Sequence, residues 1–187
     1  MNSQRRQFLQ RAALCSGLPA AAWTWPALAQ DSTQPSAAAR EAKALPLPAP
    51  GTPIALPDVD LLDGSRFEAA RVAQQVVVIY WWSSTCPFCA LQSPEMEKLW
   101  QSQRQQPDGL KLLTLSIDRK PELAAAYLRK KGYTFPAAWV TPEVHRVLPK
   151  PKGLPITLVR GRDGRVLQAE SGQLFPEDVE QLTRWLA

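Results

Sequence analysis

The sequence has 187 residues, of which 45% are hydrophobic and 21% are charged, a composition typical of one globular domain. Its formal net charge of +5 includes three arginines within the first 29 residues, and without these the 22 basic residues fall to 19 against 17 acidic ones, a net charge of +2. So small a charge excludes a surface built to bind nucleic acid.

The first 29 residues have the features of an export signal. Arg5 and Arg6 precede a weakly apolar stretch that closes on Ala27-Leu28-Ala29, a small-x-small cleavage pattern. The paired arginines are similar to those of a twin-arginine signal, which is an address for a receptor rather than an anchor. We therefore expect a periplasmic protein cleaved after Ala29. Anchoring by an uncleaved leader is less favoured, because the stretch is barely long enough to span a bilayer.

Cleavage removes Cys15 and leaves only Cys86 and Cys89 in the exported chain. Exported proteins commonly use disulfides to join distant segments. A bond between two cysteines three residues apart closes a loop too small to give useful entropic stabilisation. The spacing therefore indicates a pair of cysteines that serves redox chemistry.

Two segments follow the leader. Residues 30–53 are rich in Ala, Pro and Ser without apolar periodicity, which predicts a flexible or polyproline-like tether. We expect the folded domain to comprise residues 54–187. It begins with a β-hairpin between Val59 and Phe67, because Asp63-Gly64 suits the positive φ of a tight hairpin turn.

The remaining elements predict an α/β fold. The unbroken apolar run at 76–82 favours a central strand buried on both faces. A helix is expected from about Pro87 to Gln105, with a kink at Pro94. Further on, the pattern predicts a strand at 110–118, a helix at 121–131, a short strand at 137–140, a helical turn at 143–147, a hairpin from 156–159 and 166–170, and a closing helix at 176–187. This order gives a mixed central sheet flanked by helices.

The strand, the motif Cys86-Pro-Phe-Cys89, the following helix and the later Gly153-Leu-Pro155 resemble the thioredoxin superfamily. More narrowly, the chain is similar to the TlpA/ResA/DsbE-like exported thiol–disulfide oxidoreductases, over about residues 54–187. The resemblance implies a thioredoxin fold with an N-terminal β-hairpin extension, catalytic roles for Cys86 and Cys89, and a cis-proline at Pro155. The substrate-binding surface is then expected to comprise Trp82, Pro87, Phe88, Leu154 and Pro155.

Three residues depart from the pattern of this superfamily. Thr85 stands where the family usually has tryptophan, and Gln92 stands where many members have glutamate. Tyr80 occupies the position of a buried aspartate in cytoplasmic thioredoxins. Neither usual position therefore carries a carboxylate that could move the proton of the buried thiol.

The placement of the two cysteines predicts distinct roles. Cys86 is expected at a helix N-terminus, where unpaired N–H groups and the helix dipole favour a thiolate nucleophile. Cys89, one turn further on, is expected to be buried and to resolve the mixed disulfide. No metal or other cofactor is expected, because structural zinc needs four ligands and the chain offers one cysteine pair and a single histidine, His145.

The direction of electron flow is inferred from the lengths of two segments, which are too short for the insertions that other members of the superfamily carry. Residues 118–153 leave no space for the helical insertion of DsbA-like oxidases, and residues 30–53 are too short for the dimerisation domain of disulfide isomerases. We therefore expect a monomeric reductase or electron relay that acts on protein disulfides and is recharged by a membrane thiol donor. A disulfide oxidant and a thiol-based copper carrier are the alternatives.

Overall fold

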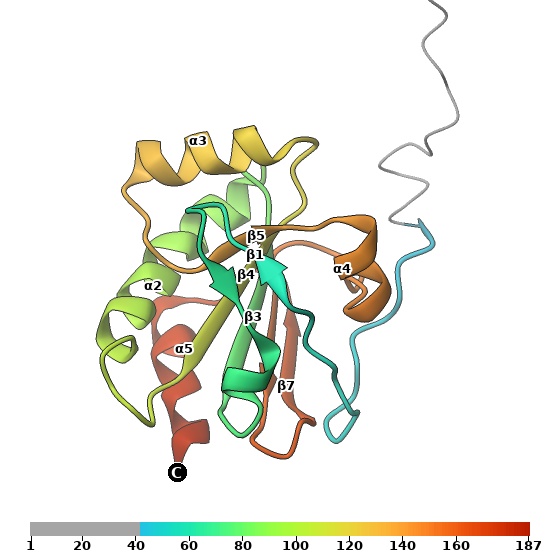
Figure 1. Ribbon diagram of the computed structural model, residues 1–187, viewed down its shortest axis with the longest axis vertical. Helices are drawn as coiled ribbons and strands as arrows, with labels where there is room; N and C mark the ends of the chain where they lie inside the picture. Colours follow the sequence, from blue (N-terminus) through green and yellow to red (C-terminus); the bar gives the residue numbers. More distant parts are fainter. Residues whose placement is uncertain (1–41) are drawn as a thin grey trace, which may run out of the picture. The chain divides into compact units, whose positions relative to one another are not determined.

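Residues 42–187 are described by the computed structural model of the protein (Figure 1). The predicted leader, and the part of the predicted tether that precedes residue 42, lie outside this range. The strands are β1 (Val59–Asp60), β2 (Arg66–Phe67), β3 (Val77–Trp82), β4 (Lys111–Ser116), β5 (Ala137–Trp139), β6 (Ile156–Arg160) and β7 (Val166–Ser171).

Five of these strands form one mixed sheet in the order β5-β4-β3-β6-β7. The central strand β3 pairs in parallel with β4 and antiparallel with β6, and β4 pairs in parallel with β5. β1 and β2 form a separate antiparallel hairpin, in which Gly64 adopts a φ of 88°. This is the thioredoxin fold with the N-terminal hairpin that the sequence predicts.

The helices are α2 (Pro87–Gln103), α3 (Pro121–Lys131), α4 (Pro142–Val147) and α5 (Pro176–Glu180), with two 3₁₀ helices, η1 (Ala69–Val72) and η2 (Gln181–Leu186). The predicted closing helix is thus divided between α5 and η2, and the helix predicted to reach Gln105 ends at Gln103. Pro94 lies inside α2 without ending it. None of the helices within residues 42–187 is both long and apolar enough to cross a membrane.

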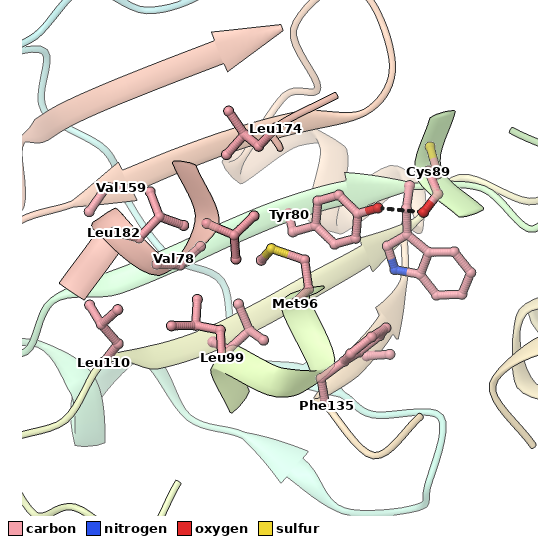
Figure 2. Packing of buried hydrophobic residues seen from close by; sticks show 14 of the residues in the cluster. Val78, Tyr80, Cys89, Met96, Leu99, Leu110, Phe135, Val159, Leu174 and Leu182 are labelled. Carbon is pink, nitrogen blue, oxygen red and sulfur yellow. Dashed lines mark hydrogen bonds between the residues drawn. The ribbon is translucent and has the colours of Figure 1, made fainter. Parts of the chain in front are cut away.

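The central strand has a covered surface on each side, which explains its unbroken apolar sequence. All six of its residues are buried. Val78, Tyr80 and Trp82 belong to a core cluster that includes residues of α2 and η2, two of which, Met96 and Leu182, are shown with Val78 and Tyr80 in Figure 2. The alternate residues of β3 belong to a second cluster that includes residues of α4 and of the hairpin. Successive side chains of a strand point to opposite faces, so each face acquires its own core.

The described part of the predicted tether differs from the expectation. Leu45 forms an isolated bridge with Pro151, and Gly51 N–H donates to the carbonyl of Val166 at 2.8 Å. The N–H of Val166 in turn donates to the carbonyl of Thr52 at 2.9 Å. Residues 45–53 are therefore held against the domain. Their contacts include hydrogen bonds between backbone groups, which impose no side-chain periodicity that the sequence could display.

Candidate active site

The motif Cys86–Cys89 lies between the end of β3 and the first turn of α2. Cys86 is the N-cap residue of α2, with φ −84° and ψ 116°, and Pro87 is the first helical residue. Proline is favoured there because the first helical N–H groups have no partner within the helix. The extended conformation of Cys86 ends the turn from β3 and places its sulfur beside the start of the helix.

The two sulfur atoms are joined in a disulfide, with the Cα atoms 5.2 Å apart. Cys86 is half-buried, whereas Cys89 is only 1% exposed. The N–H of Cys89 also donates to the Cys86 sulfur at 3.1 Å. An outer sulfur at a helix N-terminus with an inner sulfur one turn behind it is the arrangement that the sequence predicts. It can exchange one disulfide for another.

The group beneath Cys89 is a phenol rather than a carboxylate. The hydroxyl of Tyr80 donates to the carbonyl of Cys89 at 3.3 Å, as Figure 2 shows, and lies 3.1 Å from the hydroxyl of Ser93. The Ser93 hydroxyl donates to the same carbonyl at 2.7 Å. Burial raises the pKa of Tyr80, so the phenol is neutral at physiological pH. This position therefore supplies a hydrogen-bond donor and no negative charge.

Gln92, the second departure from the family pattern, is fully buried and links three parts of the fold. Its Nε2 donates to the Thr157 hydroxyl in β6 at 2.8 Å, and its Oε1 accepts from the N–H of Leu174 at 2.9 Å. An amide can donate and accept at once, whereas an ionised carboxylate can only accept. Gln92 thus links α2 to β6 through its donor and to the segment that leads to α5 through its acceptor.

The peptide bond between Leu154 and Pro155 is cis, as the resemblance implies. Pro155 is buried, and its carbonyl accepts from the N–H of Gly172 at 2.9 Å. Leu154 is half-buried and packs, as Cys86 does, against the core cluster that contains Cys89. The start of β6 is also tied to the cysteine helix through Thr157 and Gln92.

The other residues expected in the substrate-binding surface differ in exposure. Pro87 is exposed and Phe88 is 57% exposed. Leu91, which is 60% exposed, lies three residues after Phe88 and therefore on the same side of α2. This second exposed apolar residue was missed, although its spacing from Phe88 is visible in the sequence.

Trp82 does not lie at the surface where we expected it. It has no exposed area, and its Nε1–H donates to the Thr114 hydroxyl at 3.1 Å. Its ring lies 5.6 Å from that of Tyr127 and 6.3 Å from that of Phe135, measured between centroids. The structure therefore places Trp82 in the core beneath the site. Tryptophan is common in both settings, and only the three-dimensional packing separates them.

Within residues 42–187, no group of three or more His, Cys, Asp or Glu side chains is placed to hold a metal ion. His145 is exposed on α4.

Known proteins are similar to this chain in sequence, and solved structures are similar to it in fold. The chain is 23% identical over 125 residues to the thiol-disulfide oxidoreductase ResA of Halalkalibacterium halodurans, covering 64% of this chain and 67% of that protein. A crystal structure of a thioredoxin-family thiol:disulfide interchange protein from Chlorobium tepidum superposes with a TM-score of 0.66 at 19% identity, covering 75% of this chain and 99% of the other. The crystal structure of StoA from Bacillus subtilis gives 0.60 at 18% identity, covering 74% and 100%.

The fold and the cysteine pair define the class: the protein is a thiol–disulfide oxidoreductase of the thioredoxin-like type. The family follows from the sequence itself, since residues 50–166 match the model of the AhpC/TSA family. The chain belongs to that family.

Proposed function

We propose that the protein is an exported reductase or electron relay that passes two electrons to protein disulfides through Cys86 and Cys89. The observation that carries the proposal is the unequal burial of the two sulfurs. Cys86 is half-buried at the N-cap of α2, and Cys89 is 1% exposed behind it. A substrate can reach the first sulfur and not the second.

The reaction follows from this order of access. In the dithiol form, the Cys86 thiolate attacks one sulfur of the substrate disulfide and releases the other substrate sulfur as a thiolate, which takes up a proton. The Cys89 sulfur, as thiolate, then attacks Cys86 and releases the first substrate sulfur. Two electrons pass to the substrate, and the Cys86–Cys89 disulfide remains.

The backbone near Cys86 offers a place for the substrate chain. By the resemblance, cis-Pro155 and Leu154 accommodate the substrate backbone, and Phe88 and Pro87 contribute exposed surface at the start of α2. An apolar rim of this kind favours an unfolded or flexible protein substrate over a small polar thiol.

The direction of electron flow is supported by architecture. Between β4 and β6 the chain contains only α3, β5 and α4, so it carries no large helical insertion of the type found in DsbA-like oxidases. A thiol donor in the membrane would then reduce the Cys86–Cys89 disulfide after each turnover. We further propose a leader at 1–29, because Arg5 and Arg6 precede an apolar stretch that closes on Ala27-Leu28-Ala29. We also propose a monomer, because residues 30–53 are too short for the dimerisation domain of disulfide isomerases.

The proposal is tested by insulin reduction with dithiothreitol. We expect Cys86→Ser to abolish catalysis and Cys89→Ser to accumulate mixed disulfides with substrate, while Cys15→Ser in the full chain has no effect. Full activity of Cys86→Ser would refute the mechanism. A reduction potential near that of DsbA, about −120 mV, rather than near that of thioredoxin, about −270 mV, would refute the direction.

A further inference from the structure

A buried carboxylate lies beside the turn that carries Cys86. Asp118 follows β4 by two residues and is 6% exposed. In the parallel pair of strands, Trp82 at the end of β3 lies opposite Ser116 at the end of β4. The turn at 83–85 and the segment that contains Asp118 therefore leave the same edge of the sheet together.

The Asp118 carboxylate accepts hydrogen bonds from three serines. Its Oδ1 accepts from the Ser83 hydroxyl at 2.7 Å and from the Ser84 hydroxyl at 2.9 Å. The backbone N–H of Ser84 lies 3.1 Å from both carboxylate oxygens, and the Ser116 hydroxyl donates to Oδ2 at 2.9 Å. No ion pair identified within residues 42–187 includes Asp118.

The backbone of Asp118 is itself fixed by two hydrogen bonds. The Nε1–H of Trp139 donates to the Asp118 carbonyl at 2.7 Å, and the Asp118 N–H donates to the Ser116 hydroxyl at 3.1 Å. A buried carboxylate is costly unless its oxygens are hydrogen-bonded, and bonds to a charged acceptor are stronger than neutral ones. The carboxylate and the turn therefore stabilise each other.

The turn leads directly to the reactive sulfur. The N–H of Cys86 donates to the carbonyl of Ser83 at 3.1 Å, and the Thr85 hydroxyl lies 3.1 Å from that of Ser83. The two serines of the turn that donate to Asp118, Ser83 and Ser84, thus lie within three positions of Cys86. Where the family usually has a large tryptophan before the first cysteine, this chain has the small Thr85, and hydrogen bonds to Asp118 fix the turn.

We propose that Asp118 is a positioning residue for the oxidoreductase reaction. It holds Ser83 and Ser84 so that the Cys86 sulfur stays at the N-terminus of α2 when the disulfide opens. The inference rests on the proposed function, because it assigns the residue that places the nucleophile. The helix N-terminus assists the thiolate only while the sulfur remains beside it.

The test compares Asp118→Ala with Asp118→Asn. We measure the second-order rate constant with which the reduced protein attacks oxidised glutathione, and the thermal unfolding of each variant. Asp118→Ala removes all the hydrogen bonds to the carboxylate. It is expected to slow the attack at least about ten-fold, the factor that the loss of a single strong hydrogen bond would give. Asp118→Asn is expected to stay within about three-fold of the wild type, because an amide oxygen accepts from the Ser84 N–H and the serine hydroxyls can accept from the amide N–H. Asp163→Ala is the control, since Asp163 accepts from a backbone N–H in the β6–β7 turn.

Three results would overturn the proposal. One is an Asp118→Ala rate equal to that of the wild type. Another is an equal slowing by alanine and asparagine, which would assign the effect to charge rather than to positioning. If Asp118→Ala does not fold, the double variant Ser83→Ala, Ser84→Ala takes its place, because it retains the carboxylate and the hydrogen bond from the Ser84 N–H. The third refuting result is a rate of attack by this folded double variant equal to that of the wild type. A wild type that reduces neither insulin nor oxidised glutathione would instead refute the proposed function.

Discussion

Replacing Gln92 with leucine tests whether this residue is a structural link in the fold. The substitution keeps the approximate volume and removes both hydrogen bonds, leaving the Leu174 N–H and the Thr157 hydroxyl without the partners they have now. A buried polar group without a partner costs about 1–3 kcal/mol, so the two together cost about 2–6 kcal/mol. The added apolar burial recovers about 1–2 kcal/mol. We expect a net loss of about 3 kcal/mol in the free energy of unfolding.

Chemical denaturation of the oxidised protein measures this loss, and thermal unfolding should fall by about 6–12 °C for a domain of this size. Gln101→Leu on the same helix is the matched control. Gln101 also makes two side-chain hydrogen bonds, to Glu97 and Thr134, but it does so at the surface. Its loss is expected to cost no more than about 0.5 kcal/mol. A cost below about 1 kcal/mol for Gln92→Leu, or one equal to that of the control, would refute the reasoning.

Three further outcomes are expected. Trp82→Ala should lower the free energy of unfolding by about 3–5 kcal/mol in denaturation experiments, because it empties a fully buried site; a loss below about 1 kcal/mol would contradict its place in the core. Phe88→Ser and Leu91→Ser should change stability by less than about 0.5 kcal/mol, because both side chains are exposed. Both should raise KM for insulin while leaving the rate with oxidised glutathione unchanged, and an equal loss with both substrates would contradict a surface role. Burial raises the pKa of Tyr80 above its ordinary value of 10.0, so its contribution to stability is complete below pH 10 and declines as the pH rises further. Unfolding measured from pH 8 to 11 should therefore show a smaller alkaline loss for Tyr80→Phe than for the wild type, and equal losses would contradict this.

The parts of the fold that could be predicted from sequence are those specified by neighbouring residues. The apolar run before Cys86 places β3 and the start of α2, because burial on both faces removes polar alternation. Gly132 ends α3 in a left-handed conformation with φ 70°, and a glycine at the end of a helical pattern signals this directly. The spacing of Cys86 and Cys89 likewise indicates redox chemistry without reference to distant residues.

The parts that could not be predicted depend on distant partners. Gln92 bonds to residues 65 and 82 positions away along the chain. Asp118 bonds to Ser83 across 35 positions, and Trp82 to Thr114 across 32. A single sequence contains the groups but not their pairing, so Gln92 and Tyr80 are visible only as departures from a family pattern and Asp118 is not visible at all.

Two of the three departures, Tyr80 and Gln92, have a common physical consequence when their contacts are considered together. Around the buried Cys89, Tyr80 and Ser93 are neutral groups that bond to its carbonyl, and Gln92 is a neutral link to β6. The carboxylate of Asp118 lies instead on the side of the turn that precedes Cys86. Negative charge near Cys89 would oppose formation of its thiolate, whereas neutral donors do not. Neither of the usual positions beside the inner sulfur thus carries a proton-accepting carboxylate. The buried carboxylate of Asp118 instead holds the turn before Cys86, and by our proposal it fixes the position of that sulfur.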